Sequence, residues 1–303
     1  MTTVGGPATK RGRGPLGSEG RWALAFLAPT LIGLAVLSAG PILATLAISL
    51  TNWDLLTAPT FTGLDNYTAL LTDDRFLKAL RNTFFYTIVS VPLGLAIALG
   101  LAVALNQAFR GIAWIRTAYF LPVVTSTIAI ALVWQWIYSA DSGLLNQVTG
   151  FFGIPAQKWL SNPTLAMPSI IAMSIWQGLG VNIIIFLAGL QAIPSEVLDA
   201  ASVDGAAAWA RFRRITVPLL TPAIFFTGVL SLIGSFQVFD QVFVLAKPKP
   251  TDATITVVYF IYESGFKFFK MGYASAASWI LFIIVAVFTA VYFQSQRRWV
   301  YYQ

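Results

Sequence analysis

The chain has 303 residues, of which 57% are hydrophobic and only 10% are charged, and its formal net charge is +7. Soluble domains carry roughly 25% charged residues, so this composition excludes a soluble globular protein and predicts a polytopic helical membrane protein. The sequence has no Cys and no His, which excludes disulfides and removes the commonest metal ligand and proton shuttle. We therefore expect neither catalysis nor a bound metal or cofactor. The positive charge lies between apolar runs, which favours the positive-inside rule over nucleic-acid binding.

Residues 1–21 form a polar, glycine-rich and basic tail, and this composition predicts disorder. A basic start followed by an apolar run is also the form of a cleaved signal peptide. The run over 23–50 is longer than the apolar core of such a peptide. We therefore expect a first membrane span over 23–50, in which Pro29 and Pro41 are tolerated.

Five further apolar runs follow, and each is about 20 residues or longer, enough to cross roughly 30 Å of hydrocarbon. Together with the first run they predict an all-α polytopic membrane protein, with one transmembrane domain over 22–303 and six transmembrane helices. The predicted spans cover about 23–50, 84–106, 119–138, 167–190, 219–245 and 274–294.

An even number of spans puts both chain ends on the same side of the membrane. That side also carries the loop after the fourth span, with Arg211, Arg213 and Arg214, whereas most acidic loop residues fall on the other side. Loops rich in Lys and Arg remain in the cytoplasm. We therefore expect both termini and this loop to be cytoplasmic.

The longest polar interval on the predicted cytoplasmic side covers 194–218, between the fourth and fifth spans. Ser195 predicts a helix start as a capping residue, with Glu196 in the first turn, where a carboxylate suits the positive helix end. Asp204-Gly205 is a turn dipeptide and predicts a break after this short helix.

A second short helix is predicted over 206–215, with Trp209, Phe212 and Ile215 on one face at helical spacing and arginines on the others. A helical hairpin with a shallow apolar face and a basic edge suits the docking of another protein. The alternative, from the residues alone, is a surface amphipathic helix pair without a partner.

This loop resembles the EAA loop of ABC importer permeases, whose pattern reads Glu-Ala-Ala, three residues, Gly, nine residues and Ile-x-Leu-Pro. The chain has Asp199-Ala-Ala, Gly205 and Ile215-x-Val217-Pro218 at the same spacing, with Asp for Glu and Val for Leu. The flanking sequence is similar to the sugar-importer branch, of the maltose and glycerol-phosphate type. The resemblance implies a cytoplasmic coupling loop for an ATPase that includes Glu196, Asp199, Ala200, Ala201, Asp204, Gly205, Phe212, Arg213, Ile215 and Pro218.

The same resemblance implies one permease half of an ATP-driven, binding-protein-dependent importer in a bacterial inner membrane. Its expected partners are a second homologous permease subunit, two ATPase subunits and an extracytoplasmic solute-binding protein. The chain has no phosphate-binding loop of the Gly-rich Lys-Ser/Thr type, so ATP and Mg are expected on the partner ATPase. The expected solute is a sugar, an oligosaccharide or a glycerophosphodiester-like polyol.

Other stretches resemble landmarks of the same permeases, and they extend over nearly all of the chain after the basic tail. One departure is Lys247-Pro-Lys-Pro250, where the family often has a Gly-Gly-Pro turn, so the usual turn geometry is not carried over. The landmarks are Gly63-Leu-Asp-Asn-Tyr67, Asn82-Thr83, Trp159-Leu160, Phe236-x-x-Phe239-Asp240 and Gly272-Tyr-Ala-Ser-Ala276.

Neutral polar and aromatic side chains occur within the predicted spans. Aromatic rings stack on the C–H face of a sugar and amides hydrogen-bond its hydroxyls, so these residues predict a path for a polyhydroxylated solute. The alternative is that the Trp residues pack between helices and the amides bond to neighbouring backbones. The candidate path residues are Trp134, Gln135, Trp176, Gln177, Asn182 and Gln237.

Two other functions stay open. One is a self-sufficient channel or secondary carrier in which the hairpin is a cytoplasmic gate, and the other is a membrane scaffold that recruits soluble proteins. Ion-coupled carriers usually keep ionisable groups within the membrane, yet Asp240, near the outer end of the fifth span, is the only charged residue within a predicted span. This pattern counts against a coupled carrier, and the fit to the importer motif counts against both alternatives.

Overall fold

The computed structural model describes residues 18–107, 110–245 and 252–301. The predictions for most of the basic tail and for Lys247–Pro250 lie outside the described residues. Helices make up most of the described chain, and its strands are β1 (Thr51–Asn52) and β2 (Thr60–Phe61), which pair antiparallel. The predicted all-α class is confirmed.

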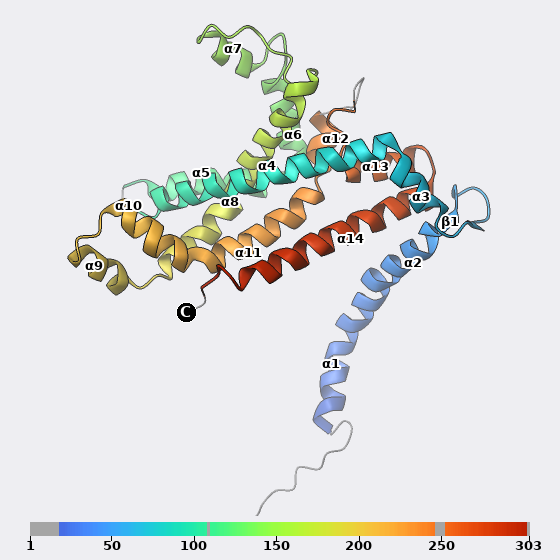
Figure 1. Cartoon of the computed structure of the whole chain (residues 1–303), viewed down its shortest axis with the longest axis horizontal. Helices are drawn as coiled ribbons and strands as arrows, with labels where there is room; N and C mark the ends of the chain where they lie inside the picture. The colour runs from blue at the N-terminus through green and yellow to red at the C-terminus, as the bar shows by residue number, and fades with distance from the viewer. Residues whose placement is uncertain (1–17, 108–109, 246–251, 302–303) are drawn as a thin grey trace, which may run out of the picture.

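Four long helices run side by side and form the body of the molecule (Figure 1): α4 (Asp74–Leu105), α8 (Pro163–Gln191), α11 (Val217–Phe236) and α14 (Met271–Gln296). Their facing sides bury large apolar side chains, each at most 1% exposed: Phe76, Ile170, Met173, Phe186 and Phe236. Other large apolar side chains of the same helices, such as Phe85, Ile88 and Phe282, are exposed around the body. This is the pattern of a bundle whose outer surface faces lipid.

Within the described residues, five helices are long and apolar enough to cross a membrane, and counting one bent pair as a single span gives six. The first runs from Trp22 to Ser49 and comprises α1 (Ser18–Leu34), a π-helical turn η1 (Ala35–Ala39) and α2 (Gly40–Ser49). Proline has no backbone N–H and crowds the preceding turn, so the wider π turn just before Pro41 accommodates it without ending the span. Figure 1 shows α1 leaving the body, while α2 packs on α14.

The third predicted span, 119–138, is not one straight helix. The structure has α5 (Ile112–Val124) and α6 (Thr127–Ile137), bent by 104° at Thr125 and Ser126. Thr125 is extended, and its hydroxyl donates to the Leu121 carbonyl at the end of α5. Because Ser and Thr side chains compete for backbone hydrogen bonds, this pair of residues allows the chain to turn within an apolar run.

The fifth predicted span, 219–245, is also divided. Helix α11 ends at Phe236, and α12 (Asp240–Leu245) begins after a short non-helical stretch, with Asp240 in its first turn, where a carboxylate suits the helix end.

Helix α4 begins at Asp74, before the predicted second span of 84–106. The carboxylate of Asp73 accepts from the N–H groups of Arg75 and Phe76 and so caps the helix at this earlier position.

The two ends of the body differ in what they carry (Figure 1). One end carries α9 (Ser195–Val203), α10 (Ala208–Arg211), the π turn η2 (Phe212–Thr216) and the last described residues of the chain. The opposite end, called the outer end after its predicted side, carries the β1–β2 hairpin, α3 (Asp65–Thr72), α13 (Val257–Tyr262) and the π turn η3 (Glu263–Lys267). Helix α7 (Leu144–Gly150) follows α6 away from the body.

The Gly63–Tyr67 landmark fastens the end of the first span to the outer end. The side-chain amide of Asn66 donates to the carbonyls of Ser49 and Thr51, at 2.9 Å each. The Tyr67 hydroxyl shares a 2.7 Å hydrogen bond with the Ser49 hydroxyl. Gly272, from another landmark, lies so close to the Thr51 carbonyl that a side chain there would collide with it.

A cluster of charged residues, the outer ion cluster, joins the start of α4 to the segment around α13. It comprises Arg75, Asp252, Glu263 and Lys267. Arg75 pairs with Glu263 and lies 3.3 Å from Asp252, and Lys267 pairs with Glu263 at 2.8 Å. Glu263 is only 6% exposed, so its charge depends on these two cations.

We expect this cluster to make stability sensitive to acid. Burial raises the pKa of the Glu263 carboxyl, but hydrogen bonds and charge attraction from Lys267 and Arg75 outweigh burial and hold the pKa below its ordinary value of 4.5. A lowered folded-state pKa stabilises the protein above that ordinary value, and the contribution is lost as the pH falls below it. The thermal unfolding temperature of the detergent-solubilised protein should therefore decrease when the pH is lowered below 4.5. The decrease should be smaller in Glu263→Gln. Equal acid sensitivity in both proteins would assign the effect to other carboxylates.

Candidate functional site

The segment 194–218 forms the helical hairpin that the sequence predicts, with α9 and α10 joined at Asp204 and Gly205. Gly205 has a φ of +74°, its N–H donates to the Ser202 carbonyl, and the N–H of Ala206 donates to the Ala201 carbonyl. These two bonds are the Schellman arrangement that ends a helix on a left-handed residue. The glycine of the motif therefore stands where the turn requires a positive φ.

The predicted cap by Ser195 is wrong, because α9 begins at Ser195 and the preceding Pro194 makes no side-chain cap. The inner side of the hairpin rests on the body through Ile193 and Leu198, which pack with Leu190 and Leu220. A bond from Arg211 to the Ser202 hydroxyl ties α10 to α9.

The outer side of the hairpin is exposed and partly apolar. Val203 is 89% exposed and Trp209 is 69% exposed, with the Trp209 ring 5.5 Å from that of Phe212. Phe212 and Ile215 themselves are half-buried, so the predicted apolar face is shared between the hairpin surface and the start of α11. Of the coupling candidates, Glu196, Asp199, Ala200, Asp204, Gly205 and Arg213 are exposed, Pro218 is half-buried and Ala201 is buried.

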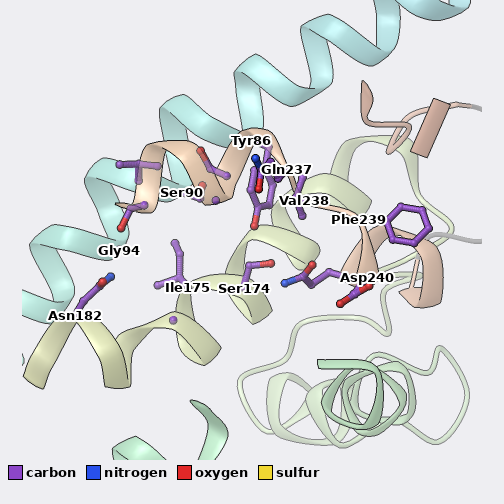
Figure 2. Close-up of a pocket in the computed structure, with 16 residues that line it drawn as sticks. Tyr86, Ser90, Gly94, Ser174, Ile175, Asn182, Gln237, Val238, Phe239 and Asp240 are labelled. Atoms are coloured by element: carbon purple, nitrogen blue, oxygen red, sulfur yellow. The ribbon is translucent and has the colours of Figure 1, made fainter. Parts of the chain in front are cut away.

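An open cavity of about 440 Å³ is lined by α4, α8, α11 and the stretch Gln237–Gln241 (Figure 2). Glycines on three facing helices help to make it: Gly94, Gly178 and Gly234 all line it, and a Cβ at Gly178 or Gly234 would meet no atom within 4 Å. Its polar lining consists mainly of hydroxyls and amides, from Tyr86, Ser90, Ser174, Asn182, Gln237 and Gln241. Asp240 is the only lining residue with a charged side chain among those that the structure describes.

Two of the six candidate path residues, Asn182 and Gln237, line this cavity. In Figure 2 Asn182 lies at one end of the labelled set and Phe239 and Asp240 at the other, with Ser174 between them. The four remaining candidates lie elsewhere, on α6 and α8. The rings of Trp134 and Trp176 lie 5.5 Å apart.

The other two candidates are amides that do not line the cavity. Gln177 donates to the Thr127 hydroxyl at 3.0 Å, just beyond the bend between α5 and α6. Gln135 is half-buried on α6 and does not line the cavity. Sequence reasoning missed Tyr86, Ser90 and Gly94, although their spacing of four residues on α4 places them on one helix face.

Comparisons with known proteins agree with this architecture. The sequence pattern of a family described as "Binding-protein-dependent transport system inner membrane component" matches residues 75–300. The chain is 39% identical over 308 residues to the probable ABC transporter permease protein YesP of Bacillus subtilis, covering 100% of this chain and 99% of that protein. It is 34% identical over 280 residues to the lactose transport system permease protein LacF of Rhizobium radiobacter, covering 90% and 93%. It is 33% identical over 272 residues to the arabinooligosaccharides transport system permease protein AraP of Bacillus subtilis, covering 88% and 85%.

A solved structure has the same fold. It is the crystal structure of a bacterial ABC transporter involved in the import of the acidic polysaccharide alginate, with a TM-score of 0.82 and 24% sequence identity over 92% of this chain and 96% of that one. At this identity the likeness speaks for the fold alone, and the family rests on the sequence matches. The predicted resemblance is confirmed. The chain belongs to the family of inner membrane components of binding-protein-dependent transport systems and is a permease subunit of the ABC transporter type.

Proposed function

We propose that the chain forms half of the translocation path of an ATP-driven importer for a neutral sugar or oligosaccharide. The observation that carries the proposal is a polar cavity within the bundle whose wall, α11, continues directly from the exposed hairpin. Relatives named for lactose and for arabinooligosaccharides support the solute class. The bacterial inner membrane, with both termini in the cytoplasm, is the proposed location.

The chemistry of the cavity favours an uncharged solute. Hydroxyls and amides both donate and accept hydrogen bonds, which matches sugar hydroxyls, and the rings of Tyr86 and Phe239 offer apolar faces. Among the residues that the structure describes, the lining has no Lys or Arg, and the Asp240 carboxylate would repel an anion. We therefore favour a sugar over a glycerophosphodiester, whose phosphate would meet no cation among the described lining residues. The volume of about 440 Å³ falls within the range of roughly 300–1,000 Å³ typical of small-molecule sites.

The hairpin is the proposed joint to two ATPase subunits, which would hold the ATP and Mg. Its exposed Val203 and Trp209 offer an apolar surface, and η2 runs without a break into α11. A movement of the hairpin would therefore tilt α11, whose far half lines the cavity at Ser231, Gly234 and Ser235. Rigid-body tilting of this kind suits alternating access between a second permease subunit and an extracytoplasmic solute-binding protein on the opposite side.

A secondary carrier is the competing function. Proton or sodium coupling usually requires ionisable groups at membrane depth. The sequences of α8 and α11, which form two walls of the cavity, contain no Asp, Glu, Lys or Arg. The proposed dependence on ATP follows from this lack of coupling groups together with the exposed hairpin.

Substitutions in the cavity test the proposed path. In the assembled importer, Asn182→Ala and Gln237→Ala are each expected to lower the uptake of the transported sugar by about tenfold, because each removes hydrogen bonds to its hydroxyls. The measurement is uptake of radiolabelled lactose, arabinotriose and glycerophosphocholine into proteoliposomes, with co-purification of the ATPase as the control for assembly. Gln135→Ala, outside the cavity, is expected to transport normally.

Two results would contradict the proposal. Normal uptake by both the Asn182 and the Gln237 variant would place the path outside this cavity. Efficient uptake of glycerophosphocholine, with none of either sugar, would overturn the preference for a neutral solute.

A further inference from the structure

The rim of the cavity contains a short stretch of backbone that belongs to no helix. Helix α11 ends at Phe236 and α12 begins at Asp240, so Gln237, Val238 and Phe239 lie between two helices. Carbonyl groups at a helix end lack intrahelical partners and need other donors when they are buried. Val238 is only 4% exposed, and its two flanking residues both line the cavity (Figure 2).

A single side chain supplies the donor for this carbonyl. The hydroxyl of Thr256, at the start of α13, donates to the Val238 carbonyl at 3.1 Å. Thr256 is completely buried, so water does not compete for either group. Replacing this donor would leave a buried carbonyl without a partner, which costs free energy unless the backbone moves.

Helix α4 holds Thr256 in place from both sides. The side-chain amide of Asn82 donates to the carbonyl of Ile255 at 2.9 Å, and the hydroxyl of Thr83 accepts from the N–H of Val257 at 3.0 Å. The two residues that bracket Thr256 are thus fixed to the same helix turn. Ile255 and Val257 are both fully buried.

We infer that Thr256 is a positioning residue that fixes the shape of the cavity rim at Gln237–Gln241, and that Asn82 and Thr83 anchor it to α4. The inference rests on the proposed function only in regarding this cavity as the solute site. Thr256 does not line the cavity, so it acts on the solute through the backbone of Val238. The Asn82-Thr83 landmark is thus the anchor of this arrangement.

A labelling experiment tests the inference without knowledge of the solute. The chain contains no Cys, so Gln237→Cys gives one reactive thiol at the rim and Asn182→Cys one at the other end of the cavity. Each is combined with Thr256→Val, which keeps the branched shape but removes the hydroxyl, or with Thr256→Ser, which keeps the hydroxyl. The rate of labelling by a water-soluble maleimide is then measured on the purified importer complex.

We expect Thr256→Val to change the labelling rate of Gln237→Cys by about tenfold, the factor that corresponds to one buried hydrogen bond of average strength. The rate at Asn182→Cys should stay the same, and Thr256→Ser should restore the rate at Gln237→Cys. Thr254→Val is the matched control, because Thr254 is also buried and lies on the same segment, two residues before Thr256. If the Thr256→Val complex does not assemble, Thr83→Val tests the same anchor from the α4 side and should change the rim rate in the same direction.

Equal rim labelling in the wild-type, Thr256→Val and Thr83→Val backgrounds would overturn the inference. Equal changes at both ends of the cavity would also overturn it, since they would indicate general loosening of the bundle. The labelling rates do not depend on uptake. A failure of the proposed function would therefore appear in the transport assay, and a failure of this inference would appear in the labelling.

Discussion

Gly205→Asp is expected to abolish uptake while leaving the protein in the membrane at normal levels. Gly205 has a φ of +74°, and a Cβ there would meet no atom within 4 Å, so the chain itself has room for a side chain. The free energy of folding is then raised only by placing a non-glycine residue at a positive φ. For Asp this costs about 1 kcal/mol or less, because Asp adopts the left-handed conformation more readily than most residues. On the proposed docking surface, however, the new carboxylate would be buried against the ATPase without a partner, which costs several kcal/mol.

The measurement is co-purification of the ATPase with the variant, alongside uptake in the same cells. Gly205→Asn adds similar bulk without charge and tolerates the same backbone. It therefore separates the effect of a buried charge at the interface from the effect of a side chain on the left-handed backbone. Gly153→Asp is the positional control, because Gly153 also has a positive φ, of +75°, and open space around it, but follows α7 far from the hairpin. Retention of both ATPase binding and transport by Gly205→Asp would show that this hairpin is not the joint.

The hairpin was predictable because its signals are local. The Asp204-Gly205 dipeptide encodes its own turn, and the structure completes it with two backbone bonds that any sequence of this kind can form. The membrane character of the chain was predictable for a similar reason, since long apolar runs without charges specify helices by composition alone. Within the hairpin, the capping contact was misassigned, because Ser195 occupies the first helical position and not the position before it.

The broken spans were not predictable from hydropathy. Residues 119–138 and 219–245 are predominantly apolar, but Thr125 and Ser126 turn the first of them, and in the second the Val238 carbonyl accepts from Thr256, 18 residues further along the chain. The hydropathy of a segment indicates whether it lies in lipid or in water, but it does not indicate where the backbone changes direction. Bonds that form only after the helices pack decide where such a span bends.

The cavity lining depends on helix rotation, and this explains why the sequence identified only part of it. Trp134 and Trp176 are polar-tipped aromatics within spans, as a sugar path would require, yet they face each other between α6 and α8. Gly178 and Gly234 line the cavity because they lack side chains, a contribution that a search for polar and aromatic residues overlooks. The lining is therefore a property of how three helices face each other.

Arg75→Met is expected to destabilise the outer end more than any other single change in the outer ion cluster. Arg75 joins the start of α4 to both Asp252 and Glu263, and Glu263 is only 6% exposed. Removing one partner of a buried pair leaves an uncompensated charge and typically costs 3–5 kcal/mol, and the remaining bond from Lys267 puts the expected loss near the lower limit, about 3 kcal/mol. The thermal unfolding midpoint in detergent should fall accordingly.

The double variant Arg75→Met/Glu263→Gln gives the sharper result. It removes the cation and the buried charge together, so it should recover most of the stability that Arg75→Met alone loses, because replacing both partners costs far less than stranding one. Lys78→Met, which removes an exposed cation from the next turn of α4, should leave the midpoint nearly unchanged. If the single and double variants unfold at the same temperature, the stranded Glu263 charge is not the cause, and the aliphatic stem of Arg75 contributes through packing instead.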